Sequence, residues 1–336
     1  MNKLKAVILF ETILILILIG IILFQNTSVF SFFSGSKTQY CEKNYYDSKE
    51  CLLSPRIYTK IIQPNSFLIL NLNPLKDDIQ GYIGKNNFNM SVYILNLRDG
   101  ASFGINVNQS YRALSLNKLP VAVIILKKIE EGKLTLDTKL PIYQRDRDSS
   151  SGTLYKEPVT ELSVRELLRY MLSESDNTAL NVLGEQESLE DLQHLSNYLG
   201  YYTEDINYEK PPFSKVFYLT PKSVSGIFSS LYLSTALEPE DSESILSYLT
   251  NTSFDIKKYA QLPGDVVVAQ KYGSSFTANE SMMHSCGIIY VEDSRFFYCV
   301  MTKDLKKEEA SEAIGNVVNK LYNFITEQNK INDIGV

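Results

Sequence analysis

Apolar and polar residues repeat along this chain with the two periods that distinguish helices from strands. In the first half, the pattern predicts a helix over residues 73–83 and two strands over 90–97 and 102–107, with the turn signal Arg98-Asp99-Gly100 between the strands. A further helix is predicted to begin at Ser115, and it is apolar almost all round through the run 121–126. Because a helix without a polar face does not suit a surface, this segment is expected to be buried.

The second half predicts mainly helices and then returns to strands. Helices are expected over 163–170, 189–199, 220–232 and 242–249, and a β-rich run over 266–270 is expected to deliver Lys271 at its end. Two apolar runs, 285–291 and 296–302, are separated by polar residues and predict a hairpin. The last helix carries an apolar stripe at helical spacing, formed by Ile314, Val317, Val318, Leu321 and Ile325.

This order of elements indicates an α/β chain of the α+β kind with two lobes. Strands at both ends of the segment 73–330 enclose helices, which gives an antiparallel sheet flanked by helices and an all-helical lobe formed by about residues 113–260. The cleft between the lobes is the expected place for a functional site.

Ahead of this domain lies a segment suited to a membrane. Lys3 and Lys5 precede a 19-residue apolar run, 6–24, which only Glu11 interrupts and which as a helix would span about 30 Å, the thickness of the hydrocarbon layer. The lysines favour a cytoplasmic N-terminus, residues 1–5, and place the rest of the chain outside. An uncleaved transmembrane anchor is favoured over a signal peptide, because the run is long and no small-residue cleavage site follows it closely. We therefore predict a membrane-anchored protein whose main domain is extracytoplasmic, in the cell envelope.

Composition and cysteine content agree with an exported globular domain. The 336 residues are 44% hydrophobic and 21% charged, and a formal charge of −6 offers no field for nucleic acid, so a monomer acting on small molecules is expected. Cys41 and Cys51 lie in the segment 25–72, a stalk and small N-terminal part, and could close one loop. Cys286 and Cys299 lie on the two arms of the hairpin, either as a disulfide or as two buried thiols.

Three short strings carry the candidate chemistry: Ser115-Leu116-Asn117-Lys118, Ser175-Asp176-Asn177 and Lys271-Tyr272-Gly273, separated by 60 residues (115 to 175) and 96 residues (175 to 271). A serine hydroxyl needs a base to become a nucleophile, and a lysine three residues later on a helix lies on the same face. Lys118 can be that base if burial or a second cation, such as Lys271, lowers its pKa. Ser175 offers a hydroxyl to pass the proton to a leaving amine, and Asn177 offers a carboxamide to hold a substrate amide.

The three strings in this order resemble the signature of class A β-lactamases and penicillin-binding proteins. The likeness extends to the flanking segments, which are Tyr111-Arg112-Ala113-Leu114 before the first serine, residues 130–137 after its helix, and residues 162–168 and 172–179 around the middle string. The chain is therefore similar to the β-lactamase/transpeptidase-like superfamily over about residues 76–328, and the resemblance implies the same two-lobed fold.

The resemblance also implies a role for each residue of the strings. Ser115 would be the nucleophile, Lys118 its base or proton relay, and Ser175 the proton shuttle. Asp176 is expected to be a structural hydrogen-bond acceptor, and the backbone N–H groups of Ser115 and Ser274 would form the oxyanion hole. Substrate binding would involve Asn177, Lys271, Gly273 and Ser274. No metal and no cofactor is expected.

Three departures from the family pattern limit the functional prediction. Class A β-lactamases carry a Glu-x-x-Leu-Asn string whose glutamate holds the deacylating water, and this chain has no such string. The nearest candidate is Glu209, in a loop that is shortened. The alternative interpretation of Glu209 is a solvated carboxylate without a catalytic role. Tyr272 stands where the family has threonine or serine, so the carboxylate pocket would be rebuilt through Ser274 or Ser275. No arginine lies between residues 271 and 293, and His284 is a weak substitute that is more often a packed strand histidine.

Three functions remain open at this stage. The first is a class A type β-lactamase, acylated at Ser115 and releasing a hydrolysed β-lactam. The second is a penicillin-binding D,D-carboxypeptidase or related enzyme acting on peptidoglycan stem peptides with slow deacylation. The third is a non-hydrolytic envelope-binding protein on the same fold, which retention of a nucleophile and base argues against. A Ser-His-Asp triad is disfavoured, because the chain has only two histidines, a surface-type His194 and His284, and no Gly-x-Ser-x-Gly string.

Overall fold

The computed structural model describes residues 70–201, 217–292 and 294–334. The predicted anchor 6–24, the pair Cys41 and Cys51, and Glu209 lie outside these residues. Within the described ranges, no helix combines the length and the apolar character needed to cross a membrane.

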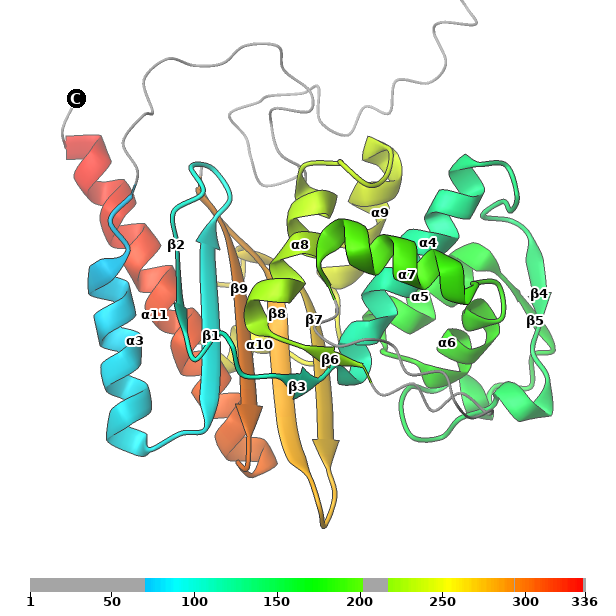
Figure 1. Ribbon diagram of the computed structural model, residues 1–336, viewed down its shortest axis with the longest axis horizontal. Helices are drawn as coiled ribbons and strands as arrows, with labels where there is room; N and C mark the ends of the chain where they lie inside the picture. The colour runs from blue at the N-terminus through cyan, green and yellow to red at the C-terminus, as the bar shows by residue number, and fades with distance from the viewer. Residues whose placement is uncertain (1–69, 202–216, 293, 335–336) are drawn as a thin grey trace, which may run out of the picture. The chain divides into compact units, whose positions relative to one another are not determined.

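A five-stranded antiparallel sheet forms one half of the domain (Figure 1). Its spatial order is β2-β1-β9-β8-β7, so the first and last parts of the chain meet between β1 and β9. This confirms the predicted antiparallel sheet built from both ends of the domain. The strands are β1 (Met90–Asn96), β2 (Ser102–Ile105), β7 (Val267–Phe276), β8 (Ser281–Val291) and β9 (Ser294–Lys303).

Both faces of the sheet are buried, and the alternation along β9 divides its side chains between two cores. Phe296, Tyr298 and Val300 belong to the core shared with the terminal helices, whereas Phe297 and Met301 belong to the core shared with the helical half. Two buried faces explain why the strand reads as one continuous apolar run rather than as an alternating pattern.

Helices cover the two faces of the sheet. On one face lie α3 (Asn73–Asn86) and α11 (Lys307–Ile334), which contact each other. The predicted stripe of α11 is confirmed, since all five of its residues, from Ile314 to Ile325, are buried. On the other face lies α8 (Pro221–Tyr232), whose Phe228 ring packs 5.4 Å from the ring of Phe297.

The remaining helices lie between β2 and β7 in the chain, and most of them form the helical half of the domain (Figure 1). Local signals start several of them: Ser163 caps α5 through a reciprocal capping box with Glu166, and Thr220 caps α8 just before Pro221. Two short antiparallel pairs, β3 (Tyr111–Arg112) with β6 (Tyr218–Leu219) and β4 (Lys139–Pro141) with β5 (Glu161–Ser163), join the segments. The helices of this half are α4 (Lys118–Glu130), α5 (Val164–Ser173), α6 (Asn177–Gly184), α7 (Leu189–Leu199) and α9 (Pro239–Leu249). The short helix α10 (Ile256–Tyr259) instead contacts α11 and belongs to the core of the terminal helices.

Three local expectations change in the structure. Ser115 does not begin an α-helix but sits in a 3-10 turn, Leu114–Asn117, and α4 begins at Lys118. Lys271 lies in the middle of β7 rather than at its end, because the polar residues after it continue the strand along the pocket. Cys286 lies directly opposite Cys299 in the hairpin and the two form a disulfide, which decides between the alternatives left open by the sequence.

Candidate active site

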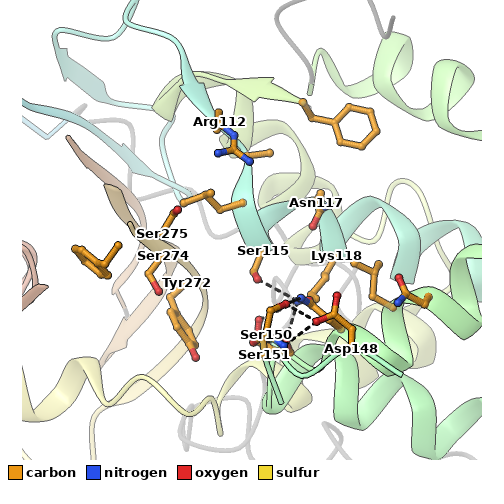
Figure 2. Close-up of a pocket in the computed structure, with 18 of the residues that line it drawn as sticks. Arg112, Ser115, Asn117, Lys118, Asp148, Ser150, Ser151, Tyr272, Ser274 and Ser275 are labelled. Carbon is orange, nitrogen blue, oxygen red and sulfur yellow. Dashed lines mark hydrogen bonds between the residues drawn. The ribbon is translucent and has the colours of Figure 1, made fainter. Parts of the chain in front are cut away.

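A pocket of about 550 Å³ lies where the Ser115 turn, the loop before Thr153, the start of α6 and strand β7 meet (Figure 2). Residues from all three sequence strings line it, including Ser115, Ser175 and Tyr272. The described lining contains one carboxylate, Asp148, and two cationic side chains, Arg112 and Lys118. Its chemistry is therefore that of hydroxyls and amines.

The turn that carries Ser115 is held from two sides. Leu114, the residue before the serine, has a left-handed backbone with φ of 49°, and the hydroxyl of buried Tyr201 donates a 2.8 Å hydrogen bond to the carbonyl of Leu116. On the strand side, a Cβ atom at Gly273 would come within 2.9 Å of the Ser115 backbone nitrogen. Glycine at this position therefore allows β7 to run directly past the serine amide.

Lys118 is the centre of the polar network. Its ammonium nitrogen, Nζ, lies 3.0 Å from the Ser115 Oγ, 3.2 Å from the Ser175 Oγ and 2.6 Å from the Asn177 Oδ1. The side chain is completely buried, and this burial lowers the pKa of Lys118 to about 7, although the charges of Asp176 and Asp148 act in the opposite direction. A lysine with this pKa can accept a proton from a serine hydroxyl near neutral pH.

The middle string is shaped to present Ser175. This serine is buried and has a left-handed backbone with φ of 56°, and its carbonyl accepts hydrogen bonds from Lys118 Nζ and Ser151 Oγ, each 2.8 Å long. The adjacent Asp176 faces the other way. Its carboxylate accepts from the backbone N–H of Leu154 and caps α6 through the N–H of Ala179, in agreement with the structural role expected for it.

A chain of hydrogen bonds continues from Lys118 to two residues that no sequence motif contains, Ser150 and Asp148. Asn177 accepts from Lys118 through its Oδ1 and donates through its Nδ2 to the Ser150 Oγ at 2.8 Å. The Ser150 hydroxyl donates in turn to the Asp148 Oδ1 (Figure 2). Asp148 and Ser150 belong to a polar loop without a motif, and they reach the site only because this loop packs against the start of α6.

Lys271 is placed near the site but inside the protein. Its side chain is fully buried, does not line the pocket, and its Nζ has no hydrogen-bond partner among the described residues. Burial, together with the neighbouring charge of Lys118, lowers the pKa of Lys271 well below its ordinary value.

The tyrosine of the third string does not offer its hydroxyl to the pocket centre. The Tyr272 hydroxyl is hydrogen-bonded to the Ser253 Oγ at 2.8 Å, and its ring packs against Phe254 at 5.5 Å. Figure 2 shows the ring directed away from Arg112. Ser274 and Ser275, which follow on the same strand, do line the pocket, as the sequence interpretation required.

Neither histidine lines the pocket, and their positions agree with a surface His194 and a packed strand His284. His194 is exposed on α7. His284 is fully buried on β8, burial lowers its pKa to about 4, and its Nε2 lies 3.0 Å from the Arg112 carbonyl, so the neutral ring donates this bond. No group of side chains in the described part of the chain has the composition of a metal site.

Comparisons with known proteins agree with this geometry. Residues 74–325 match the profile of the β-lactamase enzyme family. A β-lactamase of Phocaeicola vulgatus is 23% identical over 255 residues, which are 70% of this chain and 79% of the relative. Among solved structures, a β-lactamase from Chitinophaga pinensis DSM 2588 superposes with a TM-score of 0.68 at 20% identity, covering 75% of this chain and 100% of that one. The structure of PBP-A superposes with a TM-score of 0.67 at 22% identity, covering 76% and 97%. The structural likenesses show a β-lactamase/transpeptidase-like fold.

Proposed function

Since this chain belongs to the β-lactamase enzyme family and is a serine hydrolase of that family, we propose that it is a class A type enzyme acylated at Ser115 by β-lactams, which it then hydrolyses. One observation carries the proposal: a buried Lys118 with a pKa of about 7 lies 3.0 Å from the Ser115 Oγ and 3.2 Å from the Ser175 Oγ. A protein that only binds its ligand has no need of a nucleophile, a base and a proton shuttle in one network.

Acylation uses these three groups in sequence. Neutral Lys118 takes the proton of the Ser115 hydroxyl as its Oγ forms a bond to the lactam carbonyl carbon. Ser175 then relays a proton from Lys118 to the lactam nitrogen as the carbon–nitrogen bond breaks. Charge on the carbonyl oxygen would be stabilised by the backbone N–H groups of Ser115 and Ser274, between which Gly273 allows close approach.

Deacylation requires a base for the attacking water. We assign this role to Glu209, which lies outside the described residues, and the described lining offers Asp148 as the other carboxylate. The second candidate function, a D,D-carboxypeptidase acting on peptidoglycan stem peptides, is favoured by the absence of a Glu-x-x-Leu-Asn string, because an enzyme without a positioned base deacylates slowly.

The test is intact-protein mass spectrometry, sampled over time after penicillin G is added. A β-lactamase gives an adduct that disappears as the drug is hydrolysed, whereas a carboxypeptidase of this type gives a long-lived adduct. In Ser115→Ala, no adduct should form while circular dichroism stays unchanged. An adduct on Ser115→Ala would assign the nucleophile elsewhere. Equal adduct lifetimes in the natural protein and Glu209→Gln would remove Glu209 from the mechanism.

We further propose that the enzyme acts outside the cytoplasmic membrane, tethered by residues 6–24. Support comes from the flanking Lys3 and Lys5 and from the Cys286–Cys299 disulfide, which suits an oxidising compartment. The full chain should remain with membranes after a carbonate wash, and a chain that begins near Lys37 should be soluble. A mature protein whose N-terminus lies beyond Phe24 would show cleavage instead.

A further inference from the structure

We propose that Arg112 binds the carboxylate of the substrate, in a site that the three sequence strings do not contain. The inference rests on the proposed function for the identity of the ligand, a β-lactam or peptide with a free carboxylate. It rests on the geometry of the pocket for the residue. Arg112 is the more accessible of the two cations in the described lining, with 42% of its side chain exposed. Lys118 is buried, and its Nζ is already hydrogen-bonded to Ser115 and Asn177.

The third string cannot supply this contact as it stands. Lys271 is fully buried and does not line the pocket, so it cannot donate a hydrogen bond directly to an anion bound there. The hydroxyl of Tyr272 is committed to Ser253. The hydroxyls of Ser274 and Ser275 on this strand are uncharged, so a carboxylate that enters the pocket needs its cationic donor from another element.

Arg112 is held in place at both its backbone and its side chain. It lies on β3, paired with Tyr218 of β6, and its carbonyl accepts the hydrogen bond from buried His284. Its Nη1 donates to the Glu280 carboxylate at 2.6 Å, next to the start of β8. Two residues of the β7–β8 hairpin region therefore fix an arginine that enters from a different strand.

The guanidinium keeps donors for a ligand. Arginine has five N–H groups, and the bond to Glu280 uses only Nη1, so Nε and Nη2 have no partner among the described residues. These two nitrogens form the planar fork that binds a carboxylate through two parallel hydrogen bonds. In Figure 2, Arg112 lies above Ser115 and Ser275 lies to the upper left, whereas Lys118 and Asp148 lie to the lower right. The carboxylate would thus lie away from the base, beside the serine hydroxyls of β7.

A purely structural role for the Arg112–Glu280 pair makes a different prediction. An ion pair that only ties β3 to the hairpin would affect all ligands of the pocket equally. An arginine that binds the carboxylate affects only ligands that carry one. Penicillin G and its methyl ester differ in this charge alone and therefore separate the two roles.

The experiment measures binding without chemistry. In the full-length Ser115→Ala protein, dissociation constants for penicillin G and its methyl ester are measured by ligand-titration NMR, alone and with Arg112→Gln. We expect Arg112→Gln to weaken penicillin G binding about tenfold and to change ester binding less than twofold. The matched control is Arg169→Gln, a partly exposed arginine paired with Glu174 away from the pocket, which should change neither.

Equal losses for acid and ester, no loss for either, or no measurable penicillin G binding would overturn the assignment. If Arg112→Gln does not fold, Arg112→Lys serves instead, because it keeps the charge and loses the fork, and it should weaken penicillin G binding about threefold with the ester unchanged. Acylation of the natural protein is followed in parallel. If the natural protein is not acylated but penicillin G binding still depends on Arg112, the proposed function is contradicted. The assignment of Arg112 as the carboxylate-binding residue is then still supported.

Discussion

The two walls of the pocket differ in how their polar side chains are paired. The helical wall carries Lys118, Ser150 and Asn177, and the strand wall is formed by β3 with Arg112 and β7 with Lys271 behind it. On the helical wall, the groups around the nucleophile are paired with one another: Lys118, Asn177 and Ser150 are joined in one chain of hydrogen bonds that runs from the nucleophile to Asp148. On the strand wall, the Nζ of buried Lys271 makes no hydrogen bond among the described residues and lies 5.1 Å from the centre of the Tyr272 ring, and Arg112 keeps unused donors.

This contrast follows from what each wall has to do. Proton transfer needs groups fixed at hydrogen-bond distance before the substrate arrives, and a completed network provides that. Binding an anion needs N–H donors that no other group of the protein already uses. On the strand wall, burial of the Lys271 amine without a hydrogen bond therefore costs free energy in the empty enzyme, whereas on the helical wall hydrogen bonds offset the burial of Lys118.

The largest expected effect comes from breaking the helical wall at its centre. Lys118→Ala removes the base and should slow acylation of Ser115 by about 10² to 10⁴, the usual contribution of a positioned proton-transfer group. The measurement is the rate of labelling by a fluorescent penicillin. Lys127→Ala, on the exposed side of the same helix, is the matched control and should label at the natural rate. A change below threefold in Lys118→Ala would mean that another group is the base.

The second prediction tests the cost of burying the Lys271 amine. Lys271→Met replaces a buried amine that makes no hydrogen bond by an apolar chain of similar length, so the free energy of unfolding should rise by about 1 to 4 kcal/mol, while acylation by penicillin G becomes slower. Because the pKa of Lys271 is lower in the folded than in the unfolded state, protonation favours unfolding.

The sign of this linkage makes the gain depend on pH. The increase in the free energy of unfolding should be largest below the lowered pKa that Lys271 has in the folded state. It should vanish as pH rises toward the pKa of lysine in the unfolded chain. Thermal unfolding at pH 6 and pH 9 measures the difference, with Lys139→Met, a half-exposed lysine, as the control without such a trend. A destabilised Lys271→Met at pH 6 would show that the amine has a partner that compensates its burial.

The smallest expected effect lies at the far end of the helical network. Asp148→Asn keeps an acceptor for the Ser150 hydroxyl but removes a charge that raises the pKa of Lys118. Acylation needs neutral Lys118 and so should increase with pH through about 7; in the variant the midpoint should move to lower pH, by less than about one unit. Asp78→Asn, in an ion pair with Lys320 outside the pocket, should leave the midpoint in place. An unchanged or higher midpoint in Asp148→Asn would exclude an electrostatic role.

The sequence alone was sufficient for the strands of the main sheet, most of the longer helices and the three strings. Buried strands such as β9 and the apolar stripe of α11 can be predicted from the sequence, because a run or a period of apolar residues is a local property of the chain. Ser115, Lys118, Ser175 and Asn177 are likewise carried by short motifs, and the structure brings their side chains within hydrogen-bond distance of one Nζ.

Only the tertiary structure decided which other residues reach the site and which way their side chains point. Asp148 comes from a loop without a motif, and Arg112 comes from a two-residue strand in the segment that flanks the first string. Their place in the pocket depends on packing against α6 and the β7–β8 hairpin. The direction of Tyr272, the burial of Lys271 and the pairing of Cys286 with Cys299 depend on strand register and on neighbours far apart in the chain. Charge, pKa and the free donors of a side chain are set by those neighbours, so no local pattern of residues encodes them.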